Sequence, residues 1–256
     1  MYRKYYLKVT TDMFWMQFFW ALSFLGVMLL IHVIKIIASM FNEDDVSTFF
    51  ALSSIASNIF MLVIGIISSF GFIKYYVGHG ITRKDYFYGA AAASVGLSII
   101  LPMISALITY MVSFIINFAN LSIVWEAYKN ENIDHGGNII VDIVQSIVLT
   151  PIIELQSNPI LALFIFSVSI LTYYIVGWLI GATFYRFGTI AGIGSIVLGI
   201  LVIYIEEILM NSGLGFAIYH YTYNLPLYLS VLVLLVILGI VLWIIRQVTK
   251  RVAIKI

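Results

Sequence analysis

The chain contains no cysteine and few charged residues. Without cysteine it can form no disulfide, no thiolate metal site and no thiol nucleophile. Charged residues make up 10% of its 256 residues and apolar residues 62%, whereas a soluble globular domain is about one quarter charged and about half apolar. The mean hydropathy is +1.08. This composition excludes an ordinary soluble domain and indicates an integral membrane protein.

A second absence concerns nucleotide binding. No Gly-Lys pair occurs anywhere in the sequence, so the phosphate-binding loop GxxxxGK[ST] is missing. We therefore expect no ATP site of this type in the chain. If the protein takes part in ATP-driven work, the ATPase is another polypeptide.

Long apolar runs predict an all-α membrane protein with six transmembrane helices, since a helix of about 20 residues crosses the hydrocarbon core. We expect one transmembrane domain over residues 1–256, made of a basic N-terminal stretch, six spans, a loop between spans 2 and 3, and an external region before span 4. The expected bounds are an interfacial helix at 1–13, spans at 14–38, 49–76, 87–119, 159–185, 187–206 and 225–246, a loop at 78–86, an external region at 120–158, a re-entrant or external segment at 207–224, and a tail at 247–256.

The signs of charge are segregated along these spans. Ten of the 12 acids fall on one side of a six-span arrangement. Because short cytoplasmic loops retain positive charge, we predict that both termini are cytoplasmic. Eleven of the 13 basic residues fall on that predicted cytoplasmic side: Arg3, Lys4, Lys8, Lys74, Arg83, Lys84, Arg186, Arg246, Lys250, Arg251 and Lys255.

Two segments allow alternative interpretations. Asn138 to Glu154 competes for a seventh span, but its apolar residues share one helical face, so we favour an amphipathic helix on the outer surface. Residues 1–13 also have an apolar and a basic face, typical of a helix lying on the inner leaflet. The alternative is a basic flank that only orients the first span.

The stretch between spans 2 and 3 has the residues of a tight helical elbow. Thr82 and Asp85 in "TRKD" match a helix-capping pattern and predict that the third helix begins at about Arg83. Gly78 and Gly80 supply the backbone freedom for the end of the second helix and a sharp turn.

Arg83 and Lys84 occupy the first turn of that predicted helix, where the macrodipole disfavours cations by a few tenths of a kcal/mol to about 1 kcal/mol each. Retention at the anionic inner leaflet explains part of their placement. The part of their placement that the membrane does not explain favours contact with a partner protein.

The basic N-terminal stretch, six spans with both ends inside, and the loop pattern G-x-T-R-K-x-Y-F resemble permease subunits of ABC transporters of the type-two exporter family. The resemblance implies that the loop is a coupling helix docked on an ATP-hydrolysing subunit, and that short re-entrant helices precede the last span. It implies two ATPase subunits carrying ATP and Mg, a second permease copy or a homologous permease, and a lipid bilayer as partners. The implied coupling residues are Gly78, His79, Gly80, Ile81, Thr82, Arg83, Lys84, Asp85 and Tyr86.

The middles of the spans contain almost no ionisable residue, which argues against a secondary transporter or channel, the main alternative. Span walls rich in Phe, Tyr, Met, Ser, Thr and Gly suit amphipathic cargo, such as peptide toxins or antimicrobial peptides. We expect no cofactor in this chain, no metal site, no enzymatic activity and no nucleic-acid partner. The expected location is a cell membrane, the plasma membrane of a bacterium.

A weaker alternative is an intramembrane CAAX-type protease. Glu206 and Glu207, Phe216, His220 and Asn224 loosely resemble its EExxxR, FxxxH and HxxxN motifs, but no arginine follows the glutamates and one histidine would serve two motifs. We favour interfacial acids that end span 5, followed by a re-entrant turn.

The charge segregation predicts the accessibility of inserted tags. Tags at both termini should be inaccessible from outside intact cells, and a tag near His135 should be labelled. External labelling of the C-terminus would instead favour a seventh crossing by Asn138 to Glu154.

Overall fold

The computed structural model describes residues 5–42, 45–121, 155, 158–214 and 225–250, and within them every regular element is a helix. Six helical runs in this part of the chain are long and apolar enough to cross a membrane. The expected all-α architecture with six such helices is confirmed, and the protein is a multi-pass membrane protein. The elements are α1 (Tyr6–Asn42), α2 (Phe49–Ile67), the π-helix η1 (Ser68–Phe72), α3 (Ile73–Gly78), α4 (Arg83–Phe118), α6 (Pro159–Phe187), α7 (Thr189–Leu214) and α8 (Leu227–Lys250).

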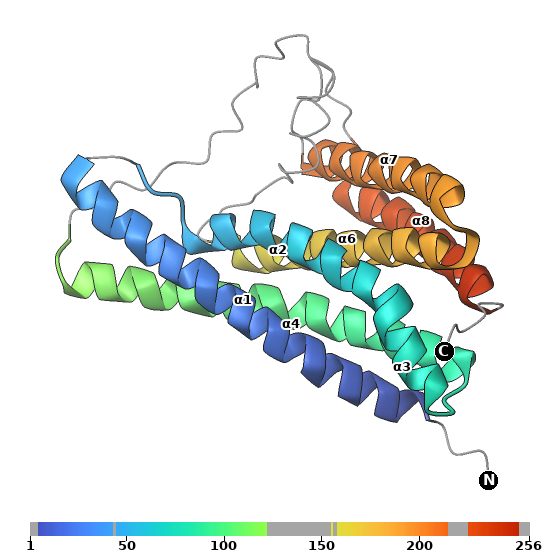
Figure 1. Ribbon diagram of the computed structural model, residues 1–256. Helices are drawn as coiled ribbons and strands as arrows, with labels where there is room; N and C mark the ends of the chain where they lie inside the picture. The colour runs from blue at the N-terminus through green and yellow to red at the C-terminus, as the bar shows by residue number, and fades with distance from the viewer. Residues whose placement is uncertain (1–4, 43–44, 122–154, 156–157, 215–224, 251–256) are drawn as a thin grey trace.

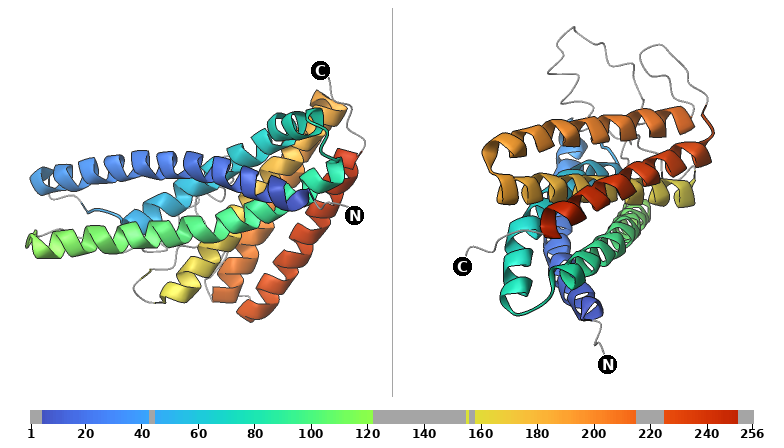
Figure 2. Two further views of the ribbon diagram at one scale, coloured as in Figure 1. Left: turned by 90° about the horizontal axis from the view of Figure 1, so that it is seen from below. Right: turned by 90° about the vertical axis from the view of Figure 1, so that its right-hand side faces the viewer.

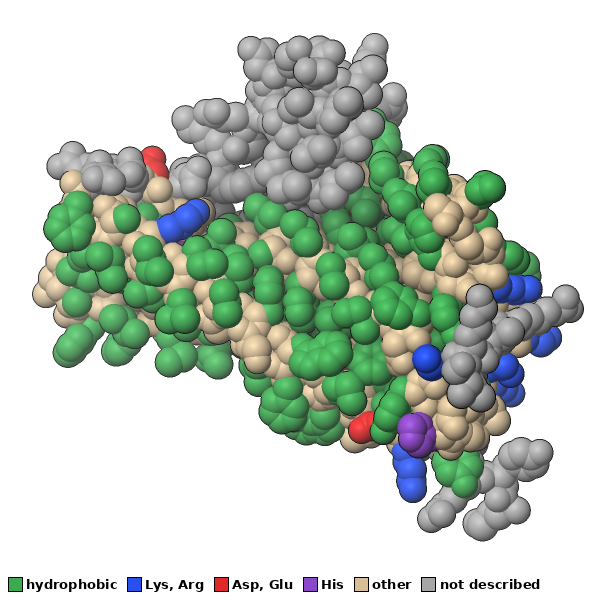
Figure 3. Space-filling model, viewed as in Figure 1, with side chains coloured by type: hydrophobic (Ala, Val, Ile, Leu, Met, Phe, Trp, Pro, Cys, Tyr) green, Lys and Arg blue, Asp and Glu red, His purple; other side chains and the backbone are tan. Residues whose placement is uncertain are grey.

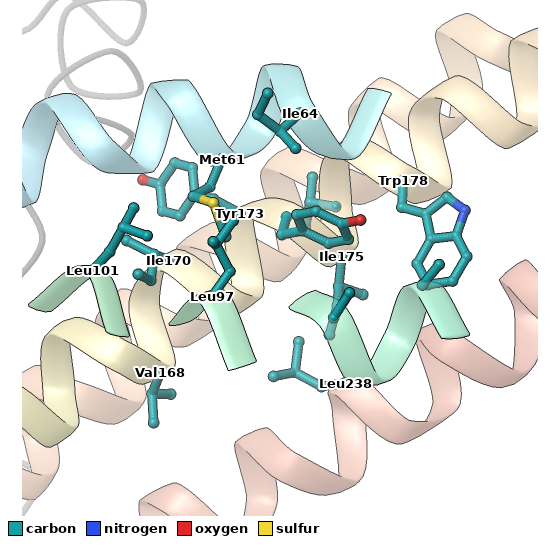
Figure 4. Packing of buried hydrophobic residues seen from close by; sticks show 14 of the residues in the cluster. Met61, Ile64, Leu97, Leu101, Val168, Ile170, Tyr173, Ile175, Trp178 and Leu238 are labelled. Carbon is teal, nitrogen blue, oxygen red and sulfur yellow. The ribbon is translucent and has the colours of Figure 1, made fainter. Parts of the chain in front are cut away.

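Helix α6 is the centre of the bundle. It contacts α2, α4, α7 and α8, and lies between α2 on one side and α7 and α8 on the other (Figures 1 and 2). Helix α1 packs mainly along α4. Side chains from α2, α4 and α8 meet those of α6 in one continuous hydrophobic core, which includes Met61, Leu97, Tyr173, Trp178 and Leu238 (Figure 4).

Local signals account for several helix ends. The Thr48 hydroxyl accepts a hydrogen bond from the Ala51 amide at 3.3 Å and caps α2. Asn158 caps α6 in the same way, and Pro159 follows at the first helical position, where its missing N–H costs nothing. Gly188, at φ 81°, separates α6 from α7 and adopts a conformation that favours glycine.

Helices α2 and α6 touch through their backbones. A Cβ atom on Gly65 would lie 2.2 Å from the carbonyl oxygen of Tyr174, and one on Gly177 would lie 2.0 Å from that of Leu62. Gly181, one turn beyond Gly177, faces α2 at a similarly short distance of 2.7 Å. Small residues four apart on one face are the usual means by which membrane helices approach closely. The glycines therefore fix the α2–α6 contact.

The run from α2 to α3 bends at η1, and α3 turns away from the direction of α2 (Figure 1). π-Helical turns are a recognised cause of such bends because the extra residue breaks the regular backbone ladder. The bend carries the end of α3 to the same end of the molecule as the start of α1 and the end of α8 (Figure 1).

Seven of the eight described basic residues lie on helix segments at that end, which carries the exposed cluster of blue side chains at the right of Figure 3. The eighth, Lys35, lies far along α1. We call this end the basic end; its members are Lys8, Lys74, Arg83, Lys84, Arg186, Arg246 and Lys250.

Two helices differ from their expected bounds. Helix α1 is continuous from Tyr6, so the described part of residues 1–13 is not a separate interfacial helix but the first turns of a 37-residue helix, about 55 Å long. Helix α7 does not end at Glu206 but continues to Leu214. Apolar periodicity does not mark where one membrane helix stops when the adjoining segment is also helical, which explains both differences.

Several expectations fall outside the described residues. These include the amphipathic helix at Asn138–Glu154 with nearly all of the external region 120–158, the re-entrant segment beyond Leu214, and the tail beyond Lys250.

The backbone contact between α2 and α6 predicts a large effect from one methyl group. Gly177→Ala should lower the free energy of unfolding by about 3 kcal/mol, because the new Cβ collides with a backbone oxygen that cannot move independently. Gly26→Ala on α1 is the control, since a Cβ atom added there would meet nothing within 4 Å. Thermal unfolding in detergent should show a lower unfolding temperature for Gly177→Ala than for Gly26→Ala. Equal stabilities of the two variants would refute the backbone contact.

Candidate functional site

The segment between α3 and α4 forms a compact turn at the basic end. The Ile81 amide donates to the Tyr76 carbonyl at 3.0 Å, and the Gly80 amide donates to the Val77 carbonyl at 3.1 Å. These two bonds, with Gly80 at φ 84°, make a Schellman motif that ends α3. The predicted role of Gly80 in a sharp turn is confirmed.

The start of α4 is also as predicted. Arg83 is its first residue, and the Thr82 hydroxyl accepts from the Asp85 amide at 3.1 Å. In the capping box that "TRKD" predicts, the Asp85 carboxylate would accept from the backbone amide of Thr82. It instead accepts from the Thr82 hydroxyl at 2.8 Å. An aspartate is one methylene shorter than the glutamate of a capping box, so its carboxylate stays beside the hydroxyl.

The nine predicted coupling residues divide into an exposed and an inward-facing group. Gly78, His79, Gly80, Thr82 and Lys84 are exposed. Ile81, Arg83 and Asp85 are half-buried, and Tyr86 is fully buried. Tyr86 therefore belongs to the interior and cannot form part of an outer contact surface. We use "elbow" below for residues 78–85.

Tyr86 connects the elbow to the bend in the preceding helix. Its hydroxyl donates to the carbonyl of Ser68, the first residue of η1. The Ser68 hydroxyl in turn lies 2.7 Å from the hydroxyl of Tyr174 on α6. The Gln17 amide nitrogen on α1 is 3.2 Å from the Ser68 hydroxyl oxygen and 3.3 Å from that of Tyr174. One buried polar network thus joins α1, η1, α4 and α6.

The sequence analysis did not find this network. Gln17, Ser68 and Tyr174 lie in apolar runs, and each alone is an ordinary polar residue in a membrane helix. The available signal was the presence of Gln17 in the uncharged core of the first span, since buried amides require partners.

Arg246 contacts the elbow from the other side, and Arg186 holds the end of the helix that carries Arg246. Arg246 near the end of α8 donates to the Arg83 carbonyl at 3.4 Å, and its guanidinium lies 5.4 Å from the centre of the Phe87 ring. Arg186 at the end of α6 donates to the carbonyls of Gln247 and Val248 at 2.8 and 2.9 Å. Because a cation is stabilising at the C-terminus of a helix, Arg186 fixes the end of α8.

Helix α1 is tied to the same region. The Tyr76 hydroxyl on α3 donates to the Asp12 carboxylate at 2.6 Å. A displacement of the elbow would therefore act on α1, α6 and α8, in addition to the two helices that the elbow joins.

The two glutamates of the protease alternative lie on α7. Glu206 is enclosed by the protein, with 1% of its surface exposed, and its expected depth at the membrane interface stays a prediction. Phe216, His220 and Asn224 fall outside the described residues. Within the described ranges, no group of three or more His, Asp or Glu side chains could hold a metal ion.

Comparisons with known proteins assign no family to the chain. No protein-family model, no curated protein and no solved structure matches it.

The cap at the start of α4 predicts a local effect. Thr82→Ala should speed hydrogen exchange of the Asp85 amide about fivefold, because removing an N-cap side chain costs about 1 kcal/mol. Thr11→Ala is the matched control, because the Thr11 hydroxyl donates to the Leu7 carbonyl within α1 and caps no helix start. Unchanged exchange at Asp85 in the Thr82 variant would contradict the cap.

Proposed function

We propose that the chain is the membrane subunit of an ATP-driven ABC exporter, and that its elbow docks on a separate ATPase subunit. Both termini and the basic end would then be cytoplasmic, in the plasma membrane of a bacterium. The observation that carries the proposal is the preformed elbow, which exposes a lysine in the first turn of α4 at the end where the basic residues gather.

Electrostatics favours a partner for this surface. The amides in the first turn of a helix carry partial positive charge, so Arg83 and Lys84 stand where cations are destabilising. An acidic or carbonyl-rich groove on an ATPase would accept charge-assisted hydrogen bonds from the exposed Lys84 and offset that cost. Attraction to anionic lipid alone requires positive charge near the membrane but no ordered turn.

The contacts behind the elbow give a route for mechanical coupling. Docking forces on the elbow would reach α6 through Tyr86, Ser68 and Tyr174. They would reach α8 through Arg246, which holds the Arg83 carbonyl. ATP-driven closure of two ATPases could therefore tilt several membrane helices together.

The export pathway in this proposal lies between two permease copies, or between this chain and a homologous permease. Large apolar side chains are exposed along α1, α4 and α8, where lipid or a second copy would cover them. The proposed cargo is amphipathic, such as a peptide toxin or an antimicrobial peptide, because such walls accept apolar faces without requiring paired charges.

One observation favours the second candidate, a secondary transporter. The sequence analysis discounted this class because the middles of the expected spans contain almost no ionisable residue, yet Glu206 is enclosed beside α6. Intramembrane carboxyl groups are characteristic of proton- and ion-coupled transport.

The proposal predicts a specific loss of partner binding. A tagged chain purified from its native membranes should bring down a polypeptide carrying a GxxxxGK[ST] loop, together with ATP hydrolysis. Lys84→Glu should reduce both about tenfold or more, because it replaces a charge-assisted hydrogen bond with repulsion. Lys84 is a sharper target than Arg83, which is half-buried and whose carbonyl binds Arg246.

Lys250→Glu is the matched control, since Lys250 is also an exposed lysine at the basic end but lies outside the elbow. It should leave ATPase recovery unchanged. Equal losses in both variants would show that the elbow has no special role. Absence of any ATPase from the wild-type preparation, with ion-driven transport in vesicles, would favour the secondary transporter.

A further inference from the structure

Glu206 lies in the interface between α6 and α7. It is 17 residues beyond the start of α7 at Thr189, or about 25 Å along the helix axis. The basic residues of α6 and α8 are Arg186, Arg246 and Lys250, all at the basic end, where α7 begins. Glu206 is therefore remote from every described cation on the neighbouring helices α6 and α8.

The polar groups that face Glu206 are hydroxyls of α6. Ser169 and Thr172, one turn apart on that helix, are 3% and 0% exposed and lie beside the carboxylate. The titratable groups that interact with it electrostatically are Glu207 of α7 and the neutral phenol of Tyr173 on α6.

Both hydroxyl protons are already used elsewhere. Ser169 donates to the amide oxygen of Asn58 at 3.2 Å, and Thr172 donates to the Val168 carbonyl at 3.0 Å. Each hydroxyl has only one proton, so with that proton donated to Asn58 or Val168 its lone pairs remain available to a cation or to a proton on Glu206. In the described part of the chain, neither oxygen of Glu206 has a hydrogen-bond partner.

The result is a buried group of oxygen acceptors around a single carboxylate. Leaving such a group without a compensating charge or proton is strongly unfavourable in a low-dielectric interior. Glu207 does not add a second ligand on the same face, because consecutive residues of a helix do not face the same side. Among the described residues, no positive charge compensates this carboxylate.

We propose that Glu206, Ser169 and Thr172 form a binding site for one small monovalent cation, either a proton or a sodium ion. A proton on the carboxyl group would be donated to a lone pair of Ser169 or Thr172. A sodium ion would be coordinated by the carboxylate and the same two hydroxyl oxygens. The site contains no residue of the elbow, and the proposal does not require an ATPase.

The test measures the thermal stability of the purified full-length chain in detergent. Unfolding temperatures are compared in sodium chloride and in N-methyl-D-glucamine chloride at equal ionic strength, each at acidic, neutral and alkaline pH. A ligand that binds only the folded state raises the unfolding temperature as its concentration rises. Sodium binding should therefore give a saturable rise of several degrees, whereas proton binding should give a stability that falls as pH rises and does not depend on sodium.

Glu206→Gln should abolish the response, and Glu207→Gln should retain it as the matched carboxylate control. Thr172→Val keeps the shape of the side chain and removes one acceptor, so it should weaken the response and serves as the readout if Glu206→Gln does not fold. Identical pH and sodium responses in the wild type and Thr172→Val, or in the wild type and Glu206→Gln, would overturn the proposal. Equal losses in the Glu206 and Glu207 variants would also overturn it.

Discussion

The contact between the backbones of α2 and α6 is the constraint on which the rest of the structure depends. In a bilayer, apolar burial gives little net attraction between helices, so close packing and polar contacts must hold them together. Gly65, Gly177 and Gly181 allow that close approach. It brings η1 against α6, where the Ser69 hydroxyl donates to the Trp178 carbonyl at 2.6 Å.

Helix α6 also relates the elbow to the Glu206 site. Tyr174 joins the polar network behind the elbow, and Thr172, two residues earlier, faces Glu206. The two sites thus share about one turn of a helix that is packed on several sides. A tightly packed helix shifts as a unit rather than deforming locally. If both proposals hold, cation binding at Glu206 and docking at the elbow would act on the same rigid element.

The elbow shows how far local sequence can predict structure. The end of α3 at Gly78, the turn at Gly80 and the start of α4 after Thr82 depend on neighbouring residues, and all three agree with expectation. The six apolar helices were predictable for a similar reason, because each requires only its own hydrophobic length. Even within the elbow, the Asp85 carboxylate binds the Thr82 hydroxyl instead of the expected backbone amide. The length of the side chain decides this partner, and the capping pattern does not specify it.

The sequence alone determined the class of protein, the number of candidate spans, the gathering of basic residues at one end and the backbone path of the elbow. Each follows from composition or from interactions within a few residues. Tertiary structure decided that Tyr86 faces inward, that Gln17 meets Ser68 and Tyr174, and that Glu206 is enclosed. These outcomes depend on which side chains other helices present across an interface. A run of apolar residues with the same hydropathy could leave a glutamate exposed or enclose it inside the bundle, and only packing distinguishes the two.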